Sequence, residues 1–452
     1  MLDGIKAKLG NSVQIQYEKG STFTNDTLVV YTDVSKQFTW EGKQGFKAEY
    51  FNNMELKAEP VAVRTENSID HFWQEGETVT GNLVATNFSA RFTTNFTATT
   101  DGSITFETEG DDAYKLIIND KDAINVWTRN RMGARTYKLK TQKDSVYKMV
   151  LEYWQGAGKG EIRLRTGNFE PTDFAALVNS IKDADAIVYV GGISPQLEGE
   201  EMPVNAPGFN GGDRTTIALP AVQTQMMKAL QTTGKPVVFV MMTGSAIAIP
   251  WEDENLPAIV NAWYGGQSAG TAVADVLFGD YNPAGRLPVT FYKSDSDLPG
   301  FSDYDMKGRT YRYFRGDALF PFGYGLSYTT FNYSNFRLPL TVTKGKNTTV
   351  TVQVTNTGKM KGEEVVQLYV SSQNKNIQAP IRALKGFQRI ELKAGETKTV
   401  KFTLTSTDLS LVNKEGKLYQ PEGKIMISVG GGQPGIKNKS SSNVLSKTII
   451  IK

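Results

Sequence analysis

The sequence contains no cysteine and a single histidine, His71. Without thiols, the chain can form no disulfide, thiol nucleophile or thiolate metal site. A Ser-His-Asp triad would have to use His71, and zinc sites built on several imidazoles are excluded. Carboxylates, tyrosine, lysine and arginine remain as the side chains available for catalysis.

The chain also lacks an excess of charge and a long apolar segment. It has 50 basic and 47 acidic residues, so its surface shows no bias toward nucleic acid or anionic membranes. No apolar run approaches about 18 residues, the length that suggests a membrane helix. Residues 1–20 lack a signal-peptide pattern. They instead predict a helix followed by a strand with alternating Val13, Ile15 and Tyr17. Because the chain opens inside a helix–strand unit, we expect a further segment to precede it.

A length of 452 residues is typical of about three domains. Two regions have the residue pattern of β-sandwiches. Residues 43–166 alternate apolar and polar side chains in short segments separated by turns, which is typical of an all-β sandwich. Residues 335–452 show the same alternation, for example at Val350, Val352 and Val354, and predict an immunoglobulin-like β-sandwich.

The intervening region alternates helices with buried strands. Continuous apolar segments at 186–190, 237–241 and 258–263 predict an α/β sandwich with a mostly parallel sheet. Residues 1–42 have the same character. We therefore predict one discontinuous α/β domain, 1–42 and 167–334, interrupted by the first β-sandwich.

Several motifs in this predicted α/β domain occur together and in a fixed order. They are Val190–Glu201 (VGGISPQLEGEE), Gly212–Arg214, Trp263–Gln267 (WYGGQ), Gly270–Gly279 (GTAVADVLFG), Asn282–Phe291 (NPAGRLPVTF), Tyr311–Phe314 and Phe320–Thr329 (FPFGYGLSYT). In number, order and spacing they resemble the C-terminal portion of family 3 glycoside hydrolases.

The two sandwiches resemble modules of the same family. Residues 46–53, with 110–112 and 152–154, are similar to a protective-antigen-type β-sandwich that some members carry inside the α/β domain. Residues from 335 resemble the fibronectin type III-like domain that ends many members. Members begin with a barrel domain that supplies the nucleophilic aspartate, and these 452 residues do not include it.

The resemblance implies part of a retaining exo-β-glycosidase, a β-glucosidase or β-xylosidase. Its substrates would be oligosaccharides or aryl and alkyl β-glycosides, with no cofactor and no metal. We expect the isolated chain to be inactive without its barrel partner, and the intact protein to be periplasmic or secreted. Two alternatives remain open: a non-catalytic, lectin-like carbohydrate-binding protein, and a subunit that pairs with a barrel on another chain.

A retaining glycosidase uses two carboxyl groups about 5–5.5 Å apart, one as nucleophile and one as acid/base. Glu198, Glu200 and Glu201 follow a predicted buried strand at its C-terminal end, where α/β folds place their sites. In the family, the acid/base is a glutamate of this loop. We favour Glu200, with Glu198 as the alternative.

Asp111, Asp112, Asp213 and Arg214 complete the candidate site residues, as sugar-binding groups. Asp213 and Arg214 are expected to form a local ion pair that supports the loop. Asp111 and Asp112 resemble the acidic pair with which protective-antigen-type lectins bind calcium and sugar. Calcium requires about six to eight oxygen ligands, however, so a tight turn is the favoured interpretation of this pair. We interpret the segment 243–245 as another turn, and His71 as structural.

Overall fold

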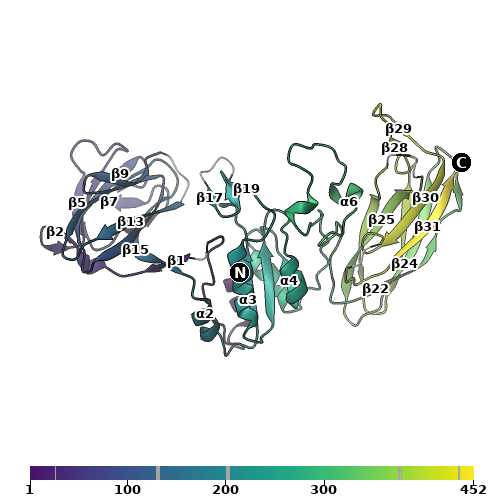
Figure 1. Ribbon diagram of the computed structural model, residues 1–452, viewed down its shortest axis with the longest axis horizontal. Helices are drawn as coiled ribbons and strands as arrows, with labels where there is room; N and C mark the ends of the chain where they lie inside the picture. The colour runs from purple at the N-terminus through teal and green to yellow at the C-terminus, as the bar shows by residue number, and fades with distance from the viewer. Residues whose placement is uncertain (26, 129–132, 200–203, 375–376, 378, 436–437) are drawn as a thin grey trace. The chain divides into compact units, whose positions relative to one another are not determined.

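The computed structural model describes residues 1–452 except 26, 129–132, 200–203, 375–376, 378 and 436–437. The described chain divides into two compact units (Figure 1). One unit joins Met1–Asn25 to Asp173–Lys452, and the other is Asp26–Thr172. Within the described residues, no helix has both the length and the apolar composition needed to cross a membrane.

The unit Asp26–Thr172 is a β-sandwich. One antiparallel sheet has the order β1-β15-β10-β13, with β6 beside β15. The other has the order β12-β11-β14-β9-β2-β3, with β4 beside β9 and β5 beside β4. The bounds are β1 Thr27–Tyr31, η1 Ser35–Gln37, β2 Phe38–Trp40, β3 Lys43–Gln44, β4 Phe46–Phe51, β5 Ala62–Glu66, β6 Asp70–Trp73, β7 Thr78–Thr80, β8 Leu83–Val84, β9 Phe88–Thr97, β10 Gly102–Asp111, β11 Ala113–Ile118, β12 Lys121–Val126, β13 Gly133–Thr141, β14 Val146–Gln155 and β15 Gly160–Pro171.

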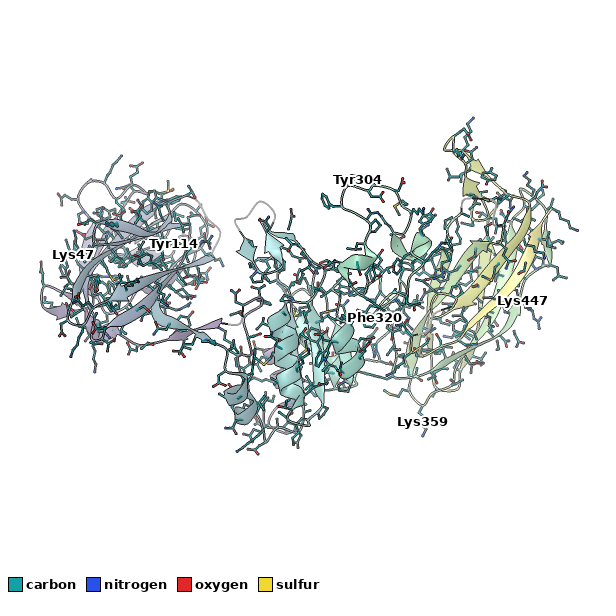
Figure 2. The ribbon with its side chains drawn as sticks, in the orientation of Figure 1. Lys47, Tyr114, Tyr304, Phe320, Lys359 and Lys447 are labelled. Carbon is teal, nitrogen blue, oxygen red and sulfur yellow. The ribbon has the colours of Figure 1, made fainter. Side chains whose placement is uncertain are left out.

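Alternating side chains fill the space between these sheets. Along β9 and β14, a buried side chain is followed by a partly exposed one. Phe92, Phe96 and Tyr153 are buried there, and Tyr114 lies among them in the core (Figure 2). Burying an aromatic side chain of this size contributes about 1.5–3 kcal/mol, so the alternation stabilises one register of the sheet.

This sandwich extends beyond the predicted limits of 43 and 166. β1 pairs with β15 along its whole length, and Phe38 of β2 is buried in the sandwich core. The assignment of residues 27–42 to the α/β domain is therefore corrected. Strands this short give little periodic signal, and their membership is decided by the strand with which they pair.

The α/β part of the other unit contains the parallel sheet β16-β20-β21. Helix α3 packs on this sheet, with Met226 and Met227 buried beside Phe239. Asp173 precedes helix α2 as its N-cap, and its Oδ1 accepts a hydrogen bond from the Ala176 amide. The bounds are α1 Leu2–Leu9, α2 Phe174–Ser180, β16 Ile187–Gly192, β17 Asn205–Ala206, β18 Phe209–Asn210, β19 Asp213–Arg214, α3 Ala221–Gln231, β20 Val237–Met242, α4 Pro250–Asn255, β21 Ala258–Asn261, α5 Ala269–Leu277, η2 Asp295–Asp297 and α6 Thr310–Tyr313.

The strand predicted near residues 13–17 is wrong. Residues 11–25 contain no strand, and the side chains of Val13 and Tyr17 are 50% and 66% exposed. Alternation alone does not form a strand, because the backbone also needs a neighbouring strand to bond.

The C-terminal part of this unit is a second β-sandwich. Its sheets have the orders β22-β24-β27 and β23-β31-β30-β25-β26. Val350, Val352 and Val354 of β24 are all fully buried between them. The first strand begins at Phe331, just before the predicted boundary of 335. The bounds are β22 Phe331–Arg337, β23 Thr341–Val342, β24 Thr348–Asn356, β25 Gly362–Ser372, β26 Ala383–Leu392, β27 Thr397–Leu404, β28 Leu411–Val412, β29 Leu418–Tyr419, β30 Gly423–Gly430 and β31 Val444–Ile451.

Candidate functional site

Three segments that follow the parallel strands meet at one edge of the sheet. Glu198 lies in the turn after β16, Ser245 follows β20, and Tyr264 follows β21. Parallel strands place their carboxyl ends at the same edge, which is where open α/β sheets position ligand sites. The order β16-β20-β21 therefore gathers side chains that are far apart along the chain.

The carboxyl group of Glu198 is hydrogen-bonded through both oxygens. The Ser245 hydroxyl donates to Oε1 at 3.0 Å, and the Tyr264 hydroxyl donates to Oε2 at 2.9 Å. Burial and the hydrogen bond to Glu198 raise the pKa of Tyr264 well above its usual range. Tyr264 therefore stays protonated and remains a hydrogen-bond donor to Glu198 at neutral pH.

Arg214 brings a positive charge to the same cluster. Its Nη1 donates to the Ser245 hydroxyl at 2.8 Å and to the Ala246 carbonyl at 2.9 Å. Burial lowers the pKa of Arg214, whereas the negative charges of Glu198 and Asp295 act in the opposite direction. The other terminal nitrogen, Nη2, is buried and has no hydrogen-bond partner within the described residues. Ser245 thus connects Arg214 to Glu198.

Two glycines allow this close packing. A Cβ atom at Gly244 would lie 2.7 Å from the Tyr264 ring and 3.1 Å from Oε2 of Glu198. A Cβ atom at Gly212 would lie 1.9 Å from the carbonyl oxygen of Gly199, and its φ of +90° also favours glycine. The hairpin that carries Arg214 therefore packs directly against the backbone next to Glu198.

Gln223 of α3 fixes the end of strand β16. Its amide donates to the Gly192 carbonyl at 2.6 Å and accepts from the Gly192 amide at 2.7 Å. It also donates to the carbonyl of Phe23 at 2.8 Å. The side chain is only 1% exposed. Gln223 consequently holds the backbone from which the Glu198 turn starts.

The predicted acidic loop is only partly within the described residues. Glu198 belongs to the cluster above, whereas Glu200 and Glu201 lie outside the described residues.

The predicted ion pair between Asp213 and Arg214 is wrong. Asp213 is exposed, and Arg214 contacts Ser245 and Ala246 instead. The two residues are consecutive in β19, so their side chains point to opposite faces of the strand.

Asp111 and Asp112 lie in the other compact unit, at the end of β10. Asp112 is buried, and its Oδ2 accepts a hydrogen bond from the Gly156 amide at 2.9 Å. The hydroxyl of Tyr153 donates to the Asp111 carbonyl. Within the described residues, no three acidic or histidine side chains form a group that could hold a metal ion.

Ser245 and Tyr264 were not predicted from the sequence as contacts of Glu198. The segment 243–245 was interpreted as a turn, although its position after a predicted parallel strand was a usable signal. Tyr264 lies within the motif WYGGQ, but nothing in its local pattern indicates its partner. His71 does have a structural environment: its ring stacks on Trp73 at 5.0 Å and contacts Glu66.

Comparisons with protein families and solved structures match nearly the whole chain. A family model described as the glycosyl hydrolase family 3 C-terminal domain matches residues 1–328. A second model, described as a fibronectin type III-like domain, matches residues 364–433. A β-glucosidase from Kluyveromyces marxianus, solved in complex with glucose, superimposes with a TM-score of 0.63 at 27% identity. The match covers 99% of this chain and 55% of that structure.

Named relatives show the same partial coverage. A xylan 1,4-β-xylosidase from Xylanibacter ruminicola is 40% identical over 92% of this chain and 48% of its own length. A periplasmic β-glucosidase from Salmonella typhimurium is 38% identical over 58% of this chain and 36% of its own length. This chain thus spans half or less of the length of these relatives.

Proposed function

Because the chain belongs to glycoside hydrolase family 3, we propose that it forms part of a retaining exo-β-glycosidase and supplies the general acid/base. The observation that carries this proposal is the cluster around Glu198, at the carboxyl ends of the parallel strands. This is the loop in which the family places its acid/base. In such a reaction the acid protonates the leaving oxygen and then, as base, deprotonates the attacking water.

We assign the acid/base to Glu200 and a positioning role to Glu198. Both oxygens of Glu198 already accept hydrogen bonds from protein hydroxyls. These two hydrogen bonds hold the carboxyl group in a fixed orientation within the protein, as expected of a positioning residue. Arg214 reaches Glu198 through Ser245 and so belongs to the same hydrogen-bonded cluster. Glu200 is two residues further along the same loop.

The proposed substrates are glycosides with a terminal β-linked xylose or glucose. The run GISPQLEGE is nearer to the xylosidase branch, and a named relative at 40% identity is a xylan 1,4-β-xylosidase. The sandwich Asp26–Thr172 keeps its interpretation as a protective-antigen-type module, in which Asp111 and Asp112 are candidates for sugar binding. We place the protein in the periplasm or outside the cell, as the name of the Salmonella relative suggests.

The chain alone is expected to hydrolyse glycosides very slowly or not at all. In the family, the nucleophilic aspartate comes from a barrel domain, and we infer that these 452 residues do not include it. Positioning both carboxyl groups around one bond contributes about 7–11 kcal/mol of barrier reduction, which an acid alone does not provide. Turnover of 4-nitrophenyl β-xyloside by purified residues 1–452 at a rate typical of an enzyme would contradict this expectation.

A chimera tests the assignment of the two glutamates. Residues 1–452 are joined to the segment of the Xylanibacter ruminicola enzyme that precedes its matched region, and aryl xylosides and glucosides are assayed. In an active chimera, E200Q should lower kcat by about 10²–10⁴-fold on substrates with poor leaving groups, the usual contribution of general acid catalysis. The loss should be much smaller on 2,4-dinitrophenyl glycosides, because these need little protonation.

E198Q serves as the matched comparison. A positioning residue should reduce activity on good and poor leaving groups alike. The reverse pattern, with leaving-group dependence in E198Q and none in E200Q, would assign the acid/base to Glu198. If neither variant affects an active chimera, the acid/base does not lie in this loop and the proposal fails.

A further inference from the structure

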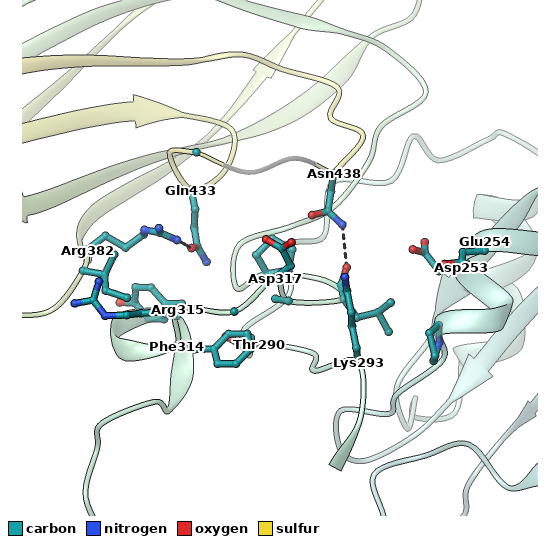
Figure 3. Close-up of a pocket in the computed structure, with 18 residues that line it drawn as sticks. Asp253, Glu254, Thr290, Lys293, Phe314, Arg315, Asp317, Arg382, Gln433 and Asn438 are labelled. Carbon is teal, nitrogen blue, oxygen red and sulfur yellow. Dashed lines mark hydrogen bonds between the residues drawn. The ribbon is translucent and has the colours of Figure 1, made fainter. Parts of the chain in front are cut away.

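A second candidate site lies where the α/β part meets the C-terminal sandwich, inside one compact unit (Figure 3). It is a cavity of about 510 Å³. This volume falls within the range of small-molecule sites, about 300–1,000 Å³. The described residues around it include some from helix α4, from α6 and the segment that follows it to Pro321, from the two residues just before β26, and Gln433, Gly435 and Asn438. None of them contacts Glu198, so the cavity is separate from the proposed catalytic site.

Charged side chains of both signs line the cavity. Among the described lining residues, three are acidic and three are basic: Asp253, Glu254, Asp317, Lys293, Arg315 and Arg382. Figure 3 shows them distributed around the cavity, together with the amides of Gln433 and Asn438. This mixed set offers both donors and acceptors to a neutral ligand with several hydroxyl groups.

Arg382 is held in place by a buried glutamine and still has N–H donors available to a ligand. Its Nη1 donates to Oε1 of Gln433 at 2.5 Å, and Nε2 of Gln433 donates to the Phe322 carbonyl at 2.6 Å. Gln433 is only 1% exposed, so it fixes the guanidinium rigidly. Burial lowers the pKa of Arg382. In the described part of the chain, no carboxylate lies within 4.0 Å of it. A guanidinium has five N–H donors, and most of these remain available to a ligand.

Two aromatic residues, Tyr311 and Phe314, are among those that line the cavity. Phe314 packs edge-on against Tyr292, with ring centroids 4.9 Å apart and planes at 85°. Tyr311 stacks on Phe322 at 4.2 Å, and its hydroxyl accepts a hydrogen bond from the Leu384 amide at 3.2 Å. Both rings are fixed by these contacts. A pyranose has apolar C–H faces as well as hydroxyl edges, and therefore matches a site that combines rings with planar polar groups.

We propose that this cavity binds a neutral, hydroxyl-rich ligand, a short oligosaccharide, at a non-catalytic site distinct from the Glu198 cluster. The carboxylates of Asp253 and Glu254 accept hydrogen bonds from sugar hydroxyls, and the side chains of Arg382, Arg315 and Asn438 donate hydrogen bonds to them. The proposal does not depend on the catalytic assignment of the loop glutamates.

Isothermal titration calorimetry of residues 1–452 with xylotriose and cellotriose tests the proposal. We expect saturable binding, and R382A should weaken it about tenfold or more, because a hydrogen bond from a charged group is lost. R315A should also weaken binding, and because Arg315 is exposed, its removal leaves the fold intact. R389A is the matched control: Arg389 lies on β26 outside the cavity and should leave binding unchanged. E198Q should likewise bind as the wild type does.

Three results would overturn the proposal. The first is no saturable binding of either trisaccharide. The second is binding that neither R382A nor R315A weakens, which would place the sugar elsewhere. The third is D-glucuronate binding about tenfold more tightly than D-xylose, because the cavity would then select an anion. Loss of binding in E198Q would instead assign the sugar to the catalytic loop, and would contradict the separate site.

Discussion

A buried ion pair joins the α/β part to the C-terminal sandwich, and the removal of one partner should strongly destabilise this unit. Nη2 of Arg286 lies 2.9 Å from Oε2 of Glu364, and the side chains are 6% and 0% exposed. The Tyr333 hydroxyl donates to the other carboxylate oxygen at 3.0 Å. Arg286→Met would leave a buried carboxylate with a single neutral donor.

The expected cost of Arg286→Met is about 3–5 kcal/mol, the range for breaking a buried pair by removing one partner. The double variant Arg286→Met/Glu364→Met should recover most of this loss, because no uncompensated charge remains. The adjacent residue in β25 provides a control. Glu363 pairs with Arg389, but these side chains are 29% and 49% exposed. Arg389→Met should therefore cost only about 0.2–1 kcal/mol.

Hydrogen exchange of the β25 amides in urea, read by mass spectrometry, reports the stability of this strand separately from the unit Asp26–Thr172. A cost below about 1 kcal/mol for Arg286→Met would refute the reasoning, since the pair would then behave like an exposed one. So would strictly additive effects of the two single substitutions, because residues in contact should show a coupling energy.

The same pair predicts a pH dependence. Burial raises the pKa of Glu364 above its usual value, although Arg286 and the Tyr333 hydroxyl lower it in part. Folding then favours the protonated form. The stabilisation from protonation is complete below the unfolded pKa of about 4.3 and is lost as pH rises through the higher folded pKa. Relative to Glu364→Gln, the wild type should gain stability as pH falls from neutral toward that range. A constant difference between the two proteins across this range would contradict the shift.

Two further substitutions test the proposed site. Gly244→Ala should displace Tyr264 from Glu198 and lower chimera activity about tenfold, whereas Gly266→Ala, whose Cβ would meet no atom within 4 Å, should be neutral; equal kinetics of the two variants would refute the steric argument. Gln223→Leu should destabilise the unit by about 1–3 kcal/mol, because the buried backbone groups of Gly192 lose their partner. Gln225 is exposed, so Gln225→Leu should change stability little. Thermal unfolding of both variants tests this, and equal midpoints for the two would contradict the prediction.

Part of the fold is encoded locally and could be predicted. The alternation of Val350, Val352 and Val354 indicates a strand whose side chains on one face are buried, and the structure has β24 there. The apolar run at 187–190 likewise became β16. Such patterns are readable because strand and helix periods are fixed by backbone geometry. The same alternation at residues 13–17 failed, since no neighbouring strand is available to pair with it.

The candidate site was predictable only in outline. A motif indicated the loop that contains Glu198, but its contacts come from residues 47 and 66 positions further along the chain. No local pattern connects Glu198 to Ser245 or to Tyr264. The side to which Arg214 points was also missed, because the sequence does not show which face of a two-residue strand meets the sheet edge.

The sequence by itself determined the chemistry available to this protein. With no thiol and one histidine, the chain has carboxylates and hydroxyls as its candidate catalytic groups, and its motifs place glutamates after the strand β16, in which Val188 and Val190 are partly exposed rather than buried as predicted. Tertiary structure alone decided which groups meet. Parallel pairing of β16, β20 and β21 brings three distant strand ends to one edge, and packing there leaves room only for glycine beside Glu198 and Tyr264. Distances between side chains depend on how strands pair and pack, and these long-range contacts have no counterpart in local periodicity.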